Sequence, residues 1–258
     1  MIEVKDLTAR YGQLAALRDV GLTLAPGEVV ALLGANGAGK TTLLHSVAGL
    51  HRTLTGQILL DGREITGQEA AESTRQGISL VPAGRQVFAG LTVRQNLQLG
   101  MHGARLSHAD KEHRIVDAIA MFPILGEFAD RPAGLLSGGQ QQMLAIARAL
   151  VRKPAYLLLD EPSLGLAPQI VSQILHAVGL LTQDGMGILL AEQNATAALG
   201  VAARGVILEN GVVMRTDAAR VLLDDPEVSS HYLGTVEEEA AGRRRRVLPP
   251  DILTPILG

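Results

Sequence analysis

Residues 34–41 read Gly-Ala-Asn-Gly-Ala-Gly-Lys-Thr and directly follow an apolar run that ends at Leu33. A strand, a glycine-rich loop and a helix that begins near Lys40 form the context that a phosphate-binding loop requires. The glycines let the backbone curl so that several N–H groups point at phosphate oxygens, and the dipole of the following helix adds positive potential. The stretch predicts a nucleotide-binding α/β fold, because a chance match to a turn-rich loop would not come with both flanking elements.

Each residue of this loop has an expected role. Lys40 would bring its charge to the β- and γ-phosphates, and the hydroxyl of Thr41 would ligate Mg²⁺. ATP and Mg²⁺ are therefore the expected cofactors. The residues expected to bind the nucleotide are Gly34, Ala35, Asn36, Gly37, Ala38, Gly39, Lys40, Thr41 and Thr42.

A second acidic element follows the apolar run Tyr156–Leu159, which ends in Asp160 and Glu161. A buried strand of this kind delivers two carboxylates at its C-terminal end, where open α/β sheets bind ligands. We expect Asp160 to hold Mg²⁺ and Glu161 to act as the general base that polarises the attacking water. A solvated Asp-Glu pair is common on its own, but it is not expected after so apolar a run in a chain with a phosphate loop.

Between these two elements lies the pentapeptide Leu136-Ser137-Gly138-Gly139-Gln140. Ser137 and the backbone N–H groups of Gly138 and Gly139 open a predicted helix and form a second anion site. Taken alone, the pentapeptide would be explained equally well by an ordinary serine N-cap with flanking glycines.

In this order the three elements resemble the ATP-hydrolysing subunit of an ABC transporter, and the resemblance extends up to about Gly234. It implies that Ser137, Gly138, Gly139 and Gln140 face the γ-phosphate of ATP held by a second ATPase subunit, in a head-to-tail dimer. It also implies that Tyr11 stacks on adenine, with a half-buried strand tyrosine as the alternative. Gln193 stands where most ABC ATPases place a histidine that senses the γ-phosphate, so a catalytic role is expected for it beside Lys40 and Glu161.

Further segments are similar to one branch, the LivF-like ATPases of bacterial branched-chain amino acid importers. These segments are Val81–Phe88, Leu91–Val93, Glu161–Pro168 and Glu192–Asn194. The resemblance implies a subunit that powers amino acid import together with a sister ATPase, two transmembrane permease subunits and, indirectly, a periplasmic solute-binding protein. Importers of urea or short amides share these features and stay an alternative.

Two rivals come from other classes. Soluble ABC ATPases of translation or DNA maintenance usually join two ATPase units in one chain or insert long coiled coils, and this sequence does neither. A phosphate-loop kinase for small molecules would leave Leu136–Gln140 unexplained.

The sequence departs from the general ABC pattern at three positions. Ala83 stands where most members have glutamine and this branch has glutamate, so it cannot reach the metal or the attacking water. Gln86 lies nearby, but no metal role is expected for it. Ala167 stands where an aspartate usually ends the loop after the catalytic glutamate, and Gln193 cannot carry the positive charge of a histidine.

The expected fold class is an α/β P-loop NTPase of the RecA-like type, with a mostly parallel sheet, an N-terminal antiparallel β subdomain and an inserted α-helical subdomain. Residues 1–236 would form the ATPase domain: 1–87 and 153–236 the nucleotide-binding core, and 88–152 the helical subdomain with the pentapeptide. Residues 237–258 include Arg243–Arg246 and are expected to be a flexible tail, with a basic patch for lipid or a partner as the alternative.

Composition excludes several classes. The formal charge of −3 gives no basic field for nucleic acid, and the absence of cysteine rules out disulfides and thiolate metal sites. Apolar runs are far shorter than the roughly 20 residues of a membrane helix. We expect a cytoplasmic protein that reaches the inner face of the cell membrane only through permease subunits.

No histidine lies in a motif: His45 is expected to pack locally, and His108 and His113 to lie on the surface.

Overall fold

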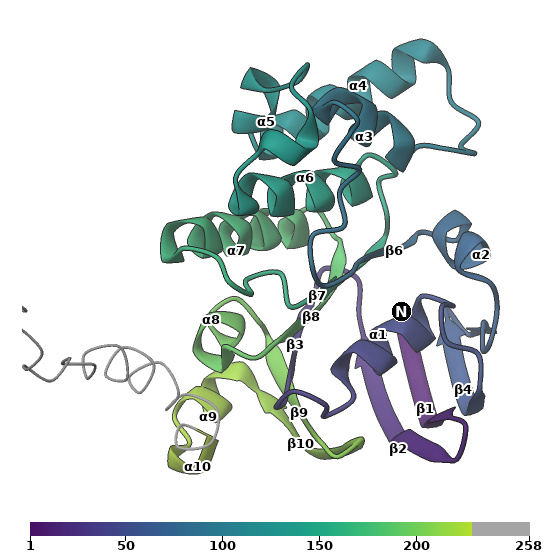
Figure 1. Cartoon of the computed structure of the whole chain (residues 1–258). Coiled ribbons are helices and arrows are strands. Elements are labelled where there is room, and N and C mark those ends of the chain that lie inside the picture. The colour runs from purple at the N-terminus through teal and green to yellow at the C-terminus, as the bar shows by residue number, and fades with distance from the viewer. Residues whose placement is uncertain (229–258) are drawn as a thin grey trace, which may run out of the picture.

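The computed structural model describes residues 1–228, which form an antiparallel sheet, a mostly parallel sheet and a group of helices (Figure 1). The tail predicted for residues 237–258 lies outside the described residues. The antiparallel and mostly parallel sheets confirm the predicted fold class. The division into a core and a helical subdomain at residues 88 and 152 stays a prediction.

The antiparallel sheet has the strand order β2-β1-β4-β5. Its strands are β1 (Ile2–Tyr11), β2 (Leu14–Leu24), β4 (Leu54–Leu60) and β5 (Arg63–Glu64). Alternate residues of β1 are buried on either side of an irregularity between Val4 and Leu7: Ile2 and Val4 before it, and Leu7 and Ala9 after it. This alternation is what a sheet with one wet face requires.

The second sheet has the order β10-β9-β3-β8-β7-β6, and all neighbours are parallel except β9 and β10. Its strands are β3 (Val29–Leu33), β6 (Ile78–Val81), β7 (Tyr156–Asp160), β8 (Gly187–Glu192), β9 (Arg204–Glu209) and β10 (Val212–Ala218). Strand β3 is buried on both faces, since Ala31 and Leu33 belong to one hydrophobic cluster and Val30 and Leu32 to the other. Continuous burial explains why β3 and β7 read as apolar runs, whereas the edge strand β10 alternates exposed and half-buried residues.

Helices α3 to α6 follow β6 and precede β7, and they lie together at the top of Figure 1. The helices of the described residues are α1 (Lys40–Val47), α2 (Ala70–Arg75), α3 (Val93–Gly100), α4 (His108–Met121), α5 (Ile124–Glu127), α6 (Gly138–Leu150), α7 (Pro168–Gln183), α8 (Ala195–Leu199), α9 (Ala219–Leu223) and α10 (Pro226–Val228). Reciprocal capping boxes start α3, α4 and α6. Among the helices of residues 1–228, none has the length and apolarity needed to cross a membrane.

The parallel strands bring three segments to one edge of the sheet. Leu33 of β3 pairs with Glu192 of β8, and Asp160 of β7 pairs with Ala191 of β8. The phosphate loop, Glu161 and Gln193 therefore leave adjacent strands at the same end. This is the end at which open parallel sheets bind their ligands.

Candidate functional site

The phosphate loop and Glu161 enclose a cavity of about 270 Å³. Gly39 precedes α1 with φ 110°, and a Cβ there would come within 2.9 Å of the Ala16 carbonyl oxygen. Only glycine fits this conformation and this space. The cavity is lined by Ala16, Asn36, Gly37, Ala38, Gly39, Lys40, Thr41, Thr42 and Glu161. Sequence reasoning missed Ala16, because an alanine within a strand carries no signal of a site.

Lys40 ties the loop to the predicted base. Its side chain is only 4% exposed, and Nζ donates to the carbonyl oxygens of Gly34 at 2.7 Å and of Ala35 at 3.3 Å. The same Nζ lies 3.2 Å from Oε1 of Glu161. Gly34 and Ala35 thus hold the lysine rather than line the cavity. A negatively charged ligand in the cavity would meet this ammonium directly.

Asp160 is a buried carboxylate without a hydrogen-bond partner for either oxygen among the described residues. Burial raises the pKa of Asp160 and the charge of Glu161 adds to the rise, while the Thr41 hydroxyl and Lys40 oppose it. Such a carboxylate beside a hydroxyl suits a hard divalent cation. The part of the chain that the structure describes holds no cluster of three metal-ligating side chains, so a cation here would need further oxygen ligands from phosphate and water.

The pentapeptide Leu136–Gln140 lies elsewhere, at the start of α6. Oγ of Ser137 accepts from the backbone N–H of Gln140 at 3.3 Å, and Oε1 of Gln140 accepts from the backbone N–H of Ser137 at 2.9 Å. None of these residues lines the phosphate-loop cavity. The structure therefore separates the two predicted halves of the nucleotide site.

Two side chains from other segments lie close to these two glycines. A Cβ on Gly138 would lie 2.5 Å from Nη1 of Arg85, and a Cβ on Gly139 would lie 2.8 Å from Cγ2 of Ile170 on α7. The helix N-terminus is thus closely covered by a cation and an apolar side chain. Sequence reasoning found neither contact, because both partners are distant along the chain.

Tyr11 and Gln193 do not line the cavity either. The ring of Tyr11 is half exposed, at 51%, and its centroid lies 4.4 Å from that of His51 at an interplanar angle of 40°. One ring partner and a large exposed area leave room for a base. Gln193 is exposed directly after β8. Adenine stacking by Tyr11 and a catalytic role for Gln193 stay predictions.

The segment after β6 follows an unusual path through Gly84, Arg85 and Gln86, which have φ values of 81°, 68° and 45°. Nε2 of Gln86 donates to the carbonyl oxygen of Ala83 at 3.3 Å, so its amide turns back onto its own segment. Nη2 of Arg148 donates to the carbonyl oxygen of Gln86 at 2.8 Å. The segment is thereby attached to α6.

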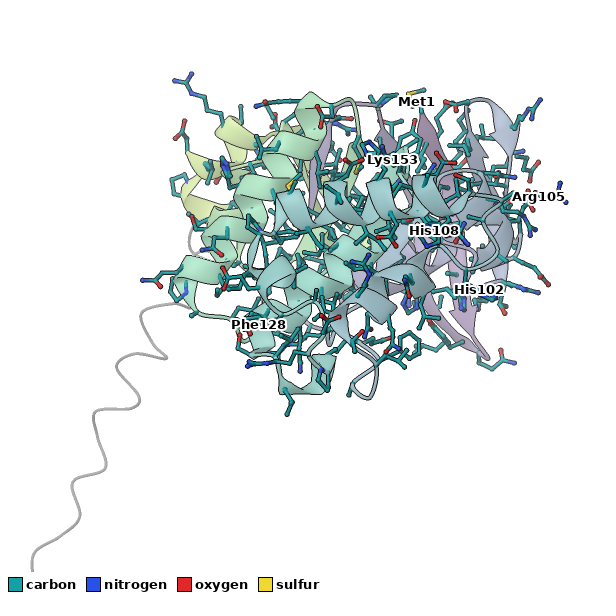
Figure 2. All side chains as sticks on the ribbon, turned by 90° about the horizontal axis from the view of Figure 1, so that it is seen from above. Met1, His102, Arg105, His108, Phe128 and Lys153 are labelled. Carbon is teal, nitrogen blue, oxygen red and sulfur yellow. The ribbon has the colours of Figure 1, made fainter. Side chains whose placement is uncertain are left out.

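None of the histidines singled out in the sequence lines the cavity, although His45 is close enough to Asp160 to oppose the rise of its pKa. His45 is half-buried within α1, and His108 and His113 are exposed on α4. Figure 2 labels His108 among the helices that follow β6. A larger cleft of about 460 Å³ is lined by Arg114 and Lys153 among others, and none of the predicted site residues belongs to it.

Comparison with known proteins agrees with this geometry. The family model described as "ABC transporter" matches residues 17–164. The chain is 43% identical to the high-affinity branched-chain amino acid transport ATP-binding protein BraG of Pseudomonas aeruginosa, over 91% of this chain and 100% of that protein. It is 37% identical to the probable branched-chain amino acid transport ATP-binding protein LivF of Archaeoglobus fulgidus, over 92% of this chain and 100% of that protein.

Solved structures of ATP-binding cassettes have the same fold. The ADP conformation of MJ1267 superposes with a TM-score of 0.80 at 26% identity, over 91% of this chain and 98% of that chain. The dimeric structure of MJ0796 gives a TM-score of 0.78 at 28% identity, over 85% of this chain and 99% of that chain. Since the family match spans more than half of the residues and both relatives align over their full length, the chain belongs to the ABC transporter family and is an ATPase subunit whose hydrolysis of ATP is coupled to transport.

Proposed function

We propose that this subunit binds ATP with Mg²⁺ in the phosphate-loop cavity and hydrolyses it in a head-to-tail dimer that powers the import of branched-chain amino acids. One observation carries the proposal of a shared site: the residues 137–140 lie outside the cavity that holds Lys40 and Glu161. A helix N-terminus offers N–H groups without intrahelical partners. A second subunit would bring that N-terminus to the γ-phosphate.

Within one subunit, the loop N–H groups and Lys40 would bind the phosphates. Thr41 and Asp160 would hold Mg²⁺, which supplies positive charge to the β- and γ-phosphate oxygens. A γ-phosphate would compete with Glu161 for the Lys40 ammonium, which now pairs with Glu161 at 3.2 Å. Glu161 would then be free to accept a proton from the attacking water. Gln193 would donate a hydrogen bond to the γ-phosphate and, unlike a histidine, add no charge.

The partner contribution would come from the start of α6. Ser137 keeps its hydroxyl proton for donation, because Oγ acts as an acceptor in the capping box. The N–H groups of Gly138 and Gly139 precede the first intrahelical hydrogen bonds. Together with the helix dipole they would form an anion site for the γ-phosphate of the opposite subunit.

Permease subunits would dock at a groove of about 390 Å³ lined by residues of β6, α3 and α6. Phe88 and Leu99 line it and are 53% and 38% exposed, while Arg148 lies over the Phe88 ring at 5.2 Å. Pro82 also lines this groove, immediately before Ala83. A docked permease segment would therefore touch the same segment that contacts the start of α6 through Arg85. This placement would make the subunit peripheral at the inner face of the membrane.

The substrate proposal rests on the names of BraG and LivF and on the segments shared with that branch. A periplasmic solute-binding protein would deliver the amino acid to the permeases. Urea or short amides are the alternative solutes. The substrate contacts would lie on those other subunits, so the solute has to be tested on the assembled transporter.

Size-exclusion chromatography with light scattering of Glu161→Gln protein tests the shared site. We expect a dimer with ATP and Mg²⁺ and a monomer with ADP, because only ATP supplies a γ-phosphate for the second subunit. A Glu161→Gln protein that stays monomeric with saturating ATP, both alone and mixed with the sister ATPase, would contradict the shared site. With the permeases in nanodiscs, stimulation of ATPase activity by a leucine-loaded but not a urea-loaded binding protein would support amino acid import.

A further inference from the structure

Glu192 is a buried carboxylate that the chemistry above does not use. It is the last residue of β8 and is only 2% exposed. Its Oε1 accepts the backbone N–H of Ser163 at 2.9 Å, and its Oε2 accepts the hydroxyl of Ser163 at 2.8 Å. Both carboxylate oxygens thus bind a single residue of the loop that follows Glu161.

This arrangement is electrostatically unfavourable on its own. Burial raises the pKa of Glu192, the charge of Glu161 adds to the rise, and the hydrogen bonds from Ser163 only oppose it. Burying a carboxylate close to a second carboxylate costs stability unless its hydrogen bonds offset the loss of water. The hydrogen bonds from Ser163 are the contacts that offset this cost.

Two successive residues at the end of β8, Ala191 and Glu192, accept hydrogen bonds from the segment around Glu161. The carbonyl oxygen of Ala191 accepts the N–H of Glu161 at 2.8 Å, and Glu192 binds Ser163 two residues further on. Between these anchors Glu161 has φ 45°, a left-handed conformation that a non-glycine residue keeps only when its surroundings enforce it. The second anchor is the Glu192–Ser163 pair.

The same anchor organises the rest of the loop. The N–H of Leu164 donates to the carbonyl oxygen of Glu161 at 3.2 Å, and the N–H of Leu166 donates to that of Ser163 at 3.1 Å. Ser163 is thus the residue through which the turn is attached to the sheet. Without Glu192, the Ser163 N–H and hydroxyl lose this attachment while the local turn remains.

We propose that Glu192 is a positioning residue for ATP hydrolysis, which holds Ser163 and thereby fixes the turn that directs the Glu161 carboxylate toward the phosphate-loop cavity. The proposal rests on the proposed role of Glu161 as general base and does not depend on the transported solute or on docking of the permeases. It places Glu192 outside contact with substrate.

The test compares Glu192→Ala, Glu192→Gln and Ser163→Ala with the unchanged protein in steady-state ATP hydrolysis, with thermal unfolding measured alongside. We expect Glu192→Ala to lower kcat about 10- to 100-fold with KM for ATP within about 2-fold, because a misplaced base weakens the chemical step and not nucleotide binding. Glu127 on α5 is exposed, so Glu127→Ala is the matched control and should leave kcat unchanged.

Glu192→Gln is the conservative variant that tests whether kcat depends on the hydrogen bonds of Glu192 or on its charge. Its amide oxygen can accept the Ser163 N–H while its NH₂ group donates to the Ser163 hydroxyl, so both contacts survive without the charge. We expect kcat within about 3-fold of the unchanged protein. Ser163→Ala keeps only the backbone contact, so its kcat should lie between those of Glu192→Ala and Glu192→Gln. The double variant with Glu192→Ala and Ser163→Ala should have the same kcat as Glu192→Ala alone.

Three results would overturn the proposal: an unchanged kcat in Glu192→Ala, independent multiplying effects of the two alanine substitutions, or a Glu192→Gln variant as slow as Glu192→Ala. If Glu192→Ala does not fold, Ser163→Ala decides, and an unchanged kcat in that variant refutes positioning. Because dimerisation is measured separately with Glu161→Gln, a failure of the shared site is distinguishable from a failure of this inference.

Discussion

The two halves of the proposed nucleotide site differ in how their polar groups are satisfied. Among residues 1–228, the half around the phosphate loop leaves both oxygens of Asp160 without a hydrogen-bond partner and holds Lys40 Nζ 3.2 Å from Glu161 Oε1. In the half at the start of α6 the side chains of Ser137 and Gln140 cap each other, which leaves the backbone N–H groups of Gly138 and Gly139 for a ligand. Charged side chains are therefore concentrated in one half, whereas the other half would supply shape and backbone N–H groups. Substitutions in the two halves should therefore impair different steps: turnover in the charged half and dimerisation in the α6 half.

The largest effect is expected in the charged half, from Glu161→Gln. A general base contributes about 10²- to 10⁴-fold to turnover, and glutamine cannot accept the proton. We expect phosphate release to fall by that factor while the Kd for ATP, measured by calorimetry, changes little. A loss of ATP binding by the same factor would show that Glu161 acts by orienting Lys40 and not by accepting a proton from water.

In the α6 half, Gly138→Asp should abolish ATP-driven dimerisation, and the turnover that depends on it, while single-subunit ATP binding stays intact. The new side chain meets the Arg85 guanidinium and brings a negative charge toward the γ-phosphate of the partner. Light scattering and calorimetry on the same sample separate the two readouts. Loss of single-subunit ATP binding would contradict the division between the halves.

Gly138→Ala distinguishes space from charge at this position. It should weaken dimerisation less than Gly138→Asp does, because it adds the clash without the charge. Adding Arg85→Ala removes the side chain that the new Cβ meets at 2.5 Å and should restore dimerisation. If Arg85→Ala does not help, contact with Arg85 is not the reason for glycine at this position.

A smaller effect is expected at the edge of the charged half. Stacking on a base is worth about 1–3 kcal/mol, so Tyr11→Ala should raise KM for ATP by roughly 5- to 100-fold with kcat nearly unchanged. Tyr11→Phe retains the ring and is the matched control. An equal effect of Tyr11→Ala on triphosphate alone, which has no base, would show that Tyr11 supports the loop and does not stack.

The same contrast separates what could be predicted from sequence from what could not. Asp160 and the phosphate loop were predictable, because contiguous residues at strand ends set their position. The start of α6 was predictable from Ser137 as an N-cap with its flanking glycines. The contacts of Gly138 with Arg85 and of Ser163 with Glu192 depend on how distant segments pack. No local pattern encodes contacts of that kind.

The smallest effect is expected on thermal stability. It tests whether burial of the Asp160 carboxylate destabilises the folded protein. Because burial raises its folded-state pKa above the unfolded value, the folded state binds the extra proton in the window between the two values. Stability therefore falls as pH rises through that window, and the full penalty is present above the raised pKa. Asp160→Asn removes the charge, so Tm at neutral pH should rise by a few degrees, at about 2–4 °C per kcal/mol.

The gain from Asp160→Asn should shrink as pH falls toward the ordinary aspartate pKa, where the unchanged protein also carries a neutral side chain. Mg²⁺ with ATP should stabilise only the unchanged protein, because asparagine is a poor substitute for a carboxylate ligand of a hard cation. Differential scanning fluorimetry across pH with EDTA or with Mg²⁺ and ATP measures both effects. A variant that is less stable than the unchanged protein at neutral pH in EDTA would show that the Asp160 carboxylate stabilises the fold. Burial of this carboxylate would then not lower the stability of the cation-free protein.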